Sequence, residues 1–297
     1  MKNNLTNYMV VNNDGEIIHY LSEGDIKILN KNYGSCSKFN ENVKNIINYN
    51  EFKSEMNNNM GSFYFYFHKD IIKNHNQYLF RFLYLSTYMN YKGYLQFGNS
   101  NKYSENSLVV KKDIQEILKL KKDTFYKTIK YFEDNKWIKY DENNKVFINN
   151  KICIRGCINK RRDCIRMFDK EIKELYENSS TSEQKTISLL FKLIPNINKN
   201  TGLIVSNVDE DNIEKLKPLK QKDIISILNL NNKKSFKCLT NLKIMNGTES
   251  AFIKLSNAFI KNVYMINPRI LYGGNDINNL KDVINNYLPL FKIGTNI

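Results

Sequence analysis

Apolar residues recur at helical spacing in the middle of the chain, and short β-prone runs flank them. The pattern predicts a helix that begins near Tyr78. Its apolar face consists of Leu79, Phe82, Leu83 and Leu85. The pattern then predicts a short strand over 94–97, a second helix over 109–118 and a third over 122–134. The predicted core positions of the last two helices are Ile114, Ile117, Leu118, Phe125, Ile129 and Phe132.

Two further β-prone runs follow the third helix, at 137–140 and 145–148, around an acidic and asparagine-rich turn. Such a pair predicts a hairpin. The order helix, strand, helix, turn, helix, hairpin is typical of a winged helix-turn-helix.

The same pattern occurs twice. Residues 112–120 recur at 222–230, beginning with Lys-Asp-Ile in both copies, and 148–156 recur at 266–274. A helical run at 186–194 and a short β-prone run at 202–205 precede the second copy, as their counterparts precede the first. This repeat predicts two winged helix-turn-helix domains in tandem.

The expected fold is therefore α+β and mostly helical, with a small N-terminal hairpin region around Asp14-Gly15. We expect an N-terminal α/β extension over 1–70, a first winged helix over 71–156, a basic linker and helix over 157–180, a second winged helix over 181–274 and a C-terminal helix over 275–297. A capping box joining Ser180 and Glu183 is expected to begin a helix. The aromatic run 63–67 favours a buried strand, with a base-stacking platform as the alternative.

Composition indicates a class of partner through the net charge. The 297 residues carry 45 Lys and Arg against 30 Asp and Glu, a net charge of +15. A protein this basic is expected to bind a polyanion such as DNA. Asn and Lys are over-used throughout, which is typical of an AT-rich coding sequence and accounts for part of that charge.

Several other classes are not supported by the sequence. No apolar run approaches the roughly 18 residues of a membrane span, and the N-terminus lacks the apolar core of a signal peptide. The five cysteines, an odd number, suggest a reducing, cytoplasmic location. Neither a phosphate-binding loop nor a nucleophile elbow occurs, and His19, His68 and His75 form no metal-binding pair. We therefore expect no catalytic residues, no metal and no cofactor; free thiols are the interpretation of Cys153, Cys157 and Cys164, with a metal site as the alternative.

The close of the second copy, from Asn262 to Gly274, resembles the end of the winged helix in firmicute plasmid replication initiators of the RepL type. The opening Gly15-Glu16-Ile17-Ile18, with Gly24-Asp25, is similar to the leader of such proteins in phages and mobile elements. The likeness is best over 78–156 and 183–274. It implies sequence-specific binding of duplex DNA at an origin or an operator, and it supplies no catalytic residues.

In a winged helix the second helix of the helix-turn-helix enters the major groove, so its outward side chains are the candidate DNA contacts. In the first copy these are Lys121, Lys122, Asp123, Thr124, Tyr126, Lys127 and Lys130, with Lys139 and Lys145 on the wing. In the second copy they are Asn231, Asn232, Lys233, Lys234, Ser235 and Lys237, with a one-residue register shift as an alternative because Phe236 aligns with Tyr126. The expected linker adds Arg161, Arg162 and Arg166 as phosphate contacts.

The expected function is replication initiation of a plasmid or phage-like element, with double-stranded DNA and host replication proteins as partners. A transcriptional regulator at an operator and an adaptor in a conjugation or partition complex are the alternatives. The C-terminal helix has two interpretations, packing on its own domain or forming a homodimer. No membrane partner is expected.

Overall fold

The computed structural model describes residues 9–11, 17–20, 61–66, 77–98, 103–156, 164–230, 233–244, 247–255 and 263–273. The chain divides into two compact units, 1–58 and 59–297. In the first unit, strands β1 (Met9–Val11) and β2 (Ile17–Tyr20) pair antiparallel on either side of Asp14-Gly15, which confirms the predicted hairpin. The predicted C-terminal helix lies outside the described residues, so the homodimer interpretation stays a prediction.

The described part of the chain is α+β, with seven α-helices and several small sheets. The largest sheet belongs to the second unit and has the strand order β12-β7-β3-β6. Every neighbouring pair in it is antiparallel. Its strands are β3 (Ser62–Tyr66), β6 (Cys153–Ile154), β7 (Cys164–Phe168) and β12 (Leu271–Tyr272).

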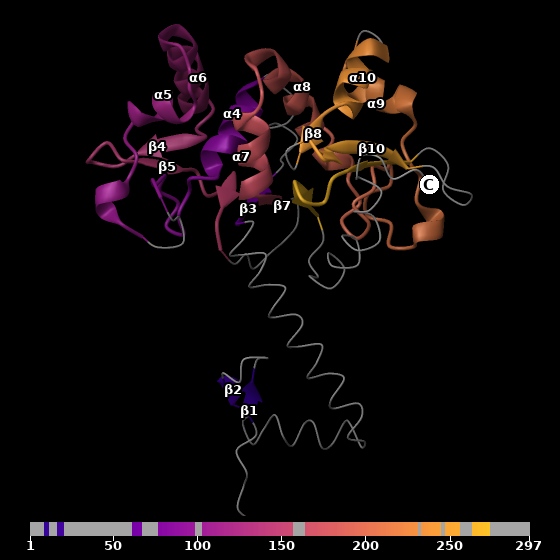
Figure 1. Ribbon diagram of the computed structural model, residues 1–297, viewed down its shortest axis with the longest axis horizontal. Helices are drawn as coiled ribbons and strands as arrows, with labels where there is room; N and C mark the ends of the chain where they lie inside the picture. Colours follow the sequence, from indigo (N-terminus) through magenta and orange to yellow (C-terminus); the bar gives the residue numbers. More distant parts are fainter. Residues whose placement is uncertain are drawn as a thin grey trace, which may run out of the picture. The chain divides into compact units, whose positions relative to one another are not determined.

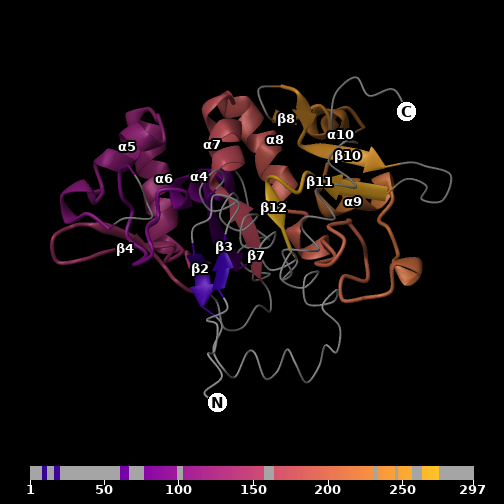
Figure 2. The same ribbon diagram turned by 60° about the horizontal axis from the view of Figure 1, so that its bottom comes forward.

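We call residues 62–156 the first repeat and 164–273 the second repeat. Each begins with a long strand at the centre of this sheet and ends with a two-residue strand at its edge. The central pair is centred on Tyr64 opposite Arg166. Because neighbouring antiparallel strands are related by a two-fold axis perpendicular to the sheet, this axis exchanges β3 with β7 and β6 with β12. A rotation about this axis does not exchange the two faces of the sheet. Equivalent helices of the two repeats accordingly lie on the same side of the sheet (Figures 1 and 2).

Between its two sheet strands the first repeat contains three α-helices and a hairpin. They are α4 (Gln77–Ser86), α5 (Asp113–Ile117), α6 (Lys122–Asp134), β4 (Ile138–Tyr140) and β5 (Val146–Ile148), with a 3-10 turn, η1, at Glu105–Ser107. The bounds of α6 are those predicted. Single bridges join Tyr94 to Phe147 and Val110 to Lys145, which attaches the segment before α5 to the hairpin.

The second repeat follows the same order with additional elements. Its helices are α7 (Asp169–Glu177), α8 (Thr181–Phe191), α9 (Gln221–Ile227) and α10 (Lys233–Thr240), with 3-10 turns η2 (Ile194–Asn196) and η3 (Ile213–Lys215). Its strands are β8 (Lys243–Ile244), β9 (Glu249–Ser250), β10 (Phe252–Leu255) and β11 (Val263–Ile266). The capping box of Ser180 and Glu183 begins α8, as predicted. A bridge from Leu203 to Met265 corresponds to that from Tyr94 to Phe147.

The recurring sequence blocks make matching hydrogen bonds. At the start of α5, Asp113 Oδ2 accepts from the Val110 N–H at 2.8 Å, and at α9 Asp223 Oδ2 accepts from the Lys220 N–H at 2.9 Å. The turns after the two helices close in the same way: Leu120 N–H donates to the Gln115 carbonyl oxygen at 3.1 Å, and Leu230 N–H donates to that of Ile225 at 3.0 Å.

The second pair of blocks also matches. Asn149 Oδ1 accepts from the Lys151 N–H at 3.1 Å, and Asn267 Oδ1 accepts from the Arg269 N–H at 2.9 Å. Both asparagines therefore form the same turn, directly before the edge strands β6 and β12. The sequence repeat is thus a structural repeat.

Two expected boundaries differ from the structure. Strand β3 was expected in the N-terminal extension of residues 1–70, but it is a central strand of the sheet in the second unit. Residues 164–168, expected in a basic linker, form β7. The physical reason is burial: Cys164, Ile165, Met167 and Phe168 are apolar and buried in the sheet. The linker was predicted from the basic residues that precede this segment.

Candidate nucleic-acid interface

Helix α6 presents a basic surface on the side opposite its core face. Phe125, Ile129 and Phe132 are buried, as predicted. The predicted outward residues are exposed: Lys121, Lys122, Asp123, Tyr126, Lys127 and Lys130; Thr124 is half-buried. Tyr126 is 55 % exposed, so its ring is open to solvent on the same surface as these lysines.

The charges on this surface remain largely available. Lys130 lies 3.5 Å from Asp134, in an exposed pair of the kind that contributes little to stability. Among the described residues, Lys121, Lys122 and Lys127 have no carboxylate within ion-pair distance. The N-terminal half of α6 therefore carries more positive than negative charge at its surface.

The hairpin after α6 contributes one exposed cation. Lys139, on β4, is exposed. Lys145 is half-buried, and its Nζ donates to the Leu108 carbonyl oxygen at 3.5 Å. The ammonium of Lys145 is thus turned toward the body of the first repeat, and Lys139 is the better candidate for contact with a ligand.

A polar contact inside the core holds α6 in place, and it was not expected from the sequence. Arg81, on α4, has no exposed surface, and its Nη1 donates to Thr128 Oγ1 of α6 at 3.0 Å. Thr128 Oγ1 in turn donates to the Thr124 carbonyl oxygen at 2.7 Å. Burial lowers the pKa of Arg81, and the neighbouring Tyr176 and Tyr78 act against that change. An arginine within the otherwise apolar sequence of α4 was the available signal.

The turn between α5 and α6 is held from the second repeat. Tyr176, on α7, donates its hydroxyl to the Leu118 carbonyl oxygen at 2.9 Å. Leu118 is the C-terminal cap of α5. Burial raises the pKa of Tyr176 to about 12, so the hydroxyl stays protonated and able to donate at neutral pH.

The second repeat places an equivalent helix, α10, after its own turn. Phe236 and Leu239 are buried, while Lys237 and Cys238 are exposed. Burial of Phe236 puts it in the role of Phe125 and not of Tyr126, in agreement with the one-residue register shift. Lys233, Lys234 and Ser235 lie on α10 without described side chains, and Asn231 and Asn232 lie outside the described residues.

The expected linker contacts need a correction. Arg166 lies on β7, where its Nη2 donates to Tyr64 Oη at 2.5 Å and its guanidinium lies 5.2 Å from the centre of the Tyr64 ring. It is a half-buried residue of the sheet and not of a linker, so it does not belong to the candidate surface. Arg161 and Arg162 lie outside the described residues.

The part of the chain that the structure describes offers no membrane span and no metal site. No helix there is long and apolar enough to cross a membrane. In the same residues, no three His, Cys, Asp or Glu side chains come close enough together to hold a metal ion. Cys153 and Cys164 are buried and Cys238 is exposed, and none of these three described cysteines is in a disulfide.

Comparison with protein-family models, with curated proteins and with solved structures found no match.

Proposed function

We propose that this chain binds double-stranded DNA in a sequence-specific manner through two winged helices, one in each repeat. The observation that carries the proposal is the exposed lysine-rich face of α6, which directly follows a turn that recurs in both repeats. The order α4, bridged strand, α5, turn, α6, hairpin supports the winged-helix assignment in the first repeat. The second repeat follows the same order from α8 to β11.

The side chains on α6 have the chemistry that a major groove requires. Lys122, Tyr126 and Lys130 are spaced four residues apart, so they lie along one side of the helix. Lysine donates to guanine O6 and N7 or to phosphate oxygens, and an exposed aromatic ring contacts the thymine methyl group. Lys121 and Lys127 flank this row and are suited to phosphates.

The two-fold relation between the repeats suggests how one chain engages DNA. With α6 and α10 on the same side of the sheet, both helices can approach one duplex. A two-fold relation gives half-sites in inverted orientation, as in a dimeric helix-turn-helix protein. Because the surface residues of α6 and α10 differ, the two half-sites are proposed to differ in sequence.

The proposed biological role is initiation of replication of a plasmid or phage-like element, and its support is the resemblance to initiators of the RepL type. An initiator marks an origin, whereas a transcriptional regulator binds an operator that overlaps a promoter. The location of the bound site in the chain's own genetic neighbourhood distinguishes the two roles.

The test is selection of duplexes from a random pool by the purified full-length chain, followed by footprinting and by affinity measurements at several salt concentrations. We expect two protected half-sites. If six to ten phosphates are contacted, affinity falls about 10³–10⁵-fold between 50 and 200 mM salt. A chain that enriches no sequence, and that ignores duplexes at 50 mM salt, contradicts the proposal and favours an adaptor role.

A further inference from the structure

The two repeats are joined by more than their shared sheet. Helices α4 and α8 pack together, with the rings of Phe80 and Phe191 stacked at 5.6 Å between centres. Helix α4 also packs on α7, where the rings of Tyr84 and Tyr176 stack at 3.9 Å with 8° between their planes. Helix α4 of the first repeat therefore contacts two helices of the second repeat.

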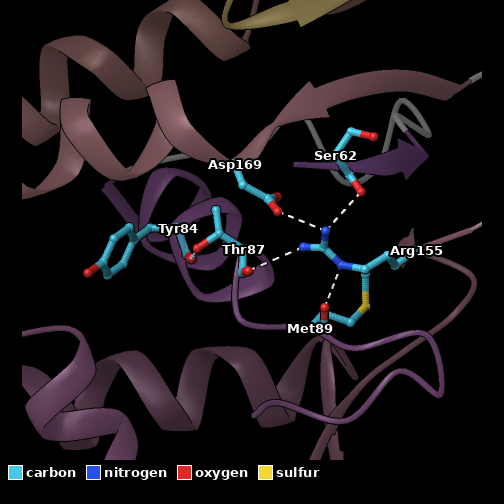
Figure 3. Close-up of polar contacts among 6 residues, drawn as sticks. All are labelled: Ser62, Tyr84, Thr87, Met89, Arg155 and Asp169. Atoms are coloured by element: carbon cyan, nitrogen blue, oxygen red, sulfur yellow. Dashed lines mark hydrogen bonds and ion pairs between the residues drawn. The ribbon is translucent and has the colours of Figure 1, made fainter. Parts of the chain in front are cut away.

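Arg155 forms a buried clamp at this junction (Figure 3). Its side chain is 2 % exposed, and Nη1 lies 2.8 Å from Asp169 Oδ2 at the start of α7. The guanidinium also donates to three carbonyl oxygens of the first repeat: Nε to Met89 at 2.5 Å, Nη1 to Ser62 at 3.0 Å and Nη2 to Thr87 at 3.2 Å. One side chain thus ties β3 and the end of α4 to the first helix of the second repeat.

The planar guanidinium suits this role because its donors point in fixed directions toward several acceptors at once. A lysine in its place would keep the positive charge near Asp169 without reaching all of these partners. Burial raises the pKa of the Asp169 carboxyl, and the Arg155 guanidinium and Lys173 act against that rise.

The clamp has a counterpart near α6. The Tyr176 hydroxyl, from the second repeat, holds the Leu118 carbonyl oxygen at the turn that leads into α6. Helix α7 therefore holds the end of α5, and through the short turn that follows it constrains where α6 begins.

We propose that Arg155, Asp169 and Tyr176 lock the two repeats in one relative orientation, so that a single chain accepts only one spacing between its half-sites. The inference rests on the proposed function for its DNA consequence, but the lock itself is a property of the free protein. Two reading modules on a flexible tether tolerate many spacings, because the tether adapts. A rigid pair engages only one half-site when the spacing changes, and the avidity of bivalent binding then disappears.

The DNA arm of the test uses the selected duplex with 2, 5 or 10 base pairs inserted between the half-sites. For the unaltered chain we expect each insertion to weaken binding about 100-fold or more, including the 10-base-pair insertion that restores the helical phase. For Arg155→Lys, whose repeats still share the sheet, we expect the 2-base-pair insertion to cost less than about tenfold and the 10-base-pair insertion to cost as much as in the unaltered chain. Lys92→Met, which removes a nearby exposed cation that lies over the Tyr103 ring, is the matched control and should behave as the unaltered chain. Equal binding of all spacings by the unaltered chain overturns the proposal while leaving duplex binding intact.

The second arm needs no DNA and separates failure of the lock from failure of the proposed function. Spin labels are placed on the natural Cys238 of α10 and on Lys130→Cys of α6, with Cys36 and Cys157 replaced by serine. Pulsed electron paramagnetic resonance should give one narrow distance distribution, which broadens in Arg155→Lys. A broad distribution in the unaltered chain overturns the lock even if no duplex is ever bound. If circular dichroism shows that Arg155→Lys does not fold, Tyr176→Phe is used in its place. The Tyr176→Phe variant keeps the stacked ring and removes only the hydroxyl.

Discussion

Lys119 and Asn229, 110 positions apart, adopt the same left-handed backbone conformation, with φ of 51° and 52°. Each lies in the turn that joins the two helices of its repeat. Most residues other than glycine are strained there, while asparagine is better tolerated. The two repeats therefore impose the same backbone requirement on different side chains.

This relationship predicts unequal effects of glycine at the two positions. Lys119→Gly should stabilise the protein by about 0.5–1 kcal/mol, because glycine removes the strain of the left-handed conformation. Asn229→Gly should stabilise it less. Urea denaturation measures both. The control is Lys127→Gly, in the interior of right-handed α6, which should destabilise by about 1 kcal/mol; a decrease of stability in Lys119→Gly would contradict the prediction.

The paired aspartates that begin α5 and α9 give a second prediction. Asp113→Ala and Asp223→Ala each remove a carboxylate that accepts a backbone N–H at 2.8 or 2.9 Å. Each should cost about 1 kcal/mol of unfolding free energy, and the two effects should add, because the sites lie in separate helices. Urea denaturation of the two single variants and the double variant tests this. Glu116→Ala, at an exposed position of α5, is the control; destabilisation confined to one repeat would show that the two turns are not equivalent in energy.

The basic surface of α6 gives a prediction on DNA binding. Lys122→Gln and Lys127→Gln should each weaken binding to the selected duplex, and removal of each phosphate-bound lysine should reduce the salt slope by about one. Tyr126→Ala should instead change the preferred bases within one half-site. Binding titrations over a salt series, and repeated selection, distinguish these outcomes. Lys151→Gln, at the turn before β6, is the control; equal weakening in that variant would indicate a general effect of charge.

The buried Glu171 on α7 predicts a pH dependence of stability. Its side chain is 1 % exposed, and burial, with Glu174 nearby, raises the pKa of its carboxyl to about 7. Arg269 acts against this rise, while Glu249 adds to it; Arg269 Nε lies 3.4 Å from Glu249 Oε2. Arg269 thus pairs with Glu249, and its charge, with that of Lys170, opposes the rise in the pKa of Glu171.

The carboxyl of such an acid has a higher pKa in the folded chain than in the unfolded chain. At any pH between these two pKa values, the folded chain binds more protons than the unfolded chain. Stability should then fall as the pH rises from about 4.5 to about 7, by up to about 3 kcal/mol, and level off above. Glu171→Gln should remove most of this slope. Urea denaturation from pH 5 to 8 checks it, and an unchanged slope in the variant would assign the pH dependence to another group.

Local elements of this fold were predictable because their signals lie within a few residues. The bounds of α6, the capping box of Ser180 and Glu183 and the hairpin of β4 and β5 follow from spacing, capping and turn chemistry. The exposed face of α6 followed from the same reasoning, by subtracting Phe125, Ile129 and Phe132 from the helix.

Arg166 and Arg155 show where local reasoning ends. Arg166 follows a basic run in the sequence and was expected in a linker, yet its strand pairs with β3, about 100 positions earlier. The sequence pattern did not single out Arg155, although its guanidinium binds groups of both repeats. Nothing local distinguishes either residue from an exposed arginine, because their partners are distant in the chain.

The amino-acid pattern alone was enough to predict that the chain contains a repeat and which positions of its helices face inward. How the two copies meet is a property of the folded chain. Pairing of β3 with β7 and burial of Arg155 against Asp169 depend on contacts between segments far apart in the sequence. Such contacts stabilise the fold only when both surfaces are removed from water together. The local sequence of one segment therefore does not show which other segment it packs against.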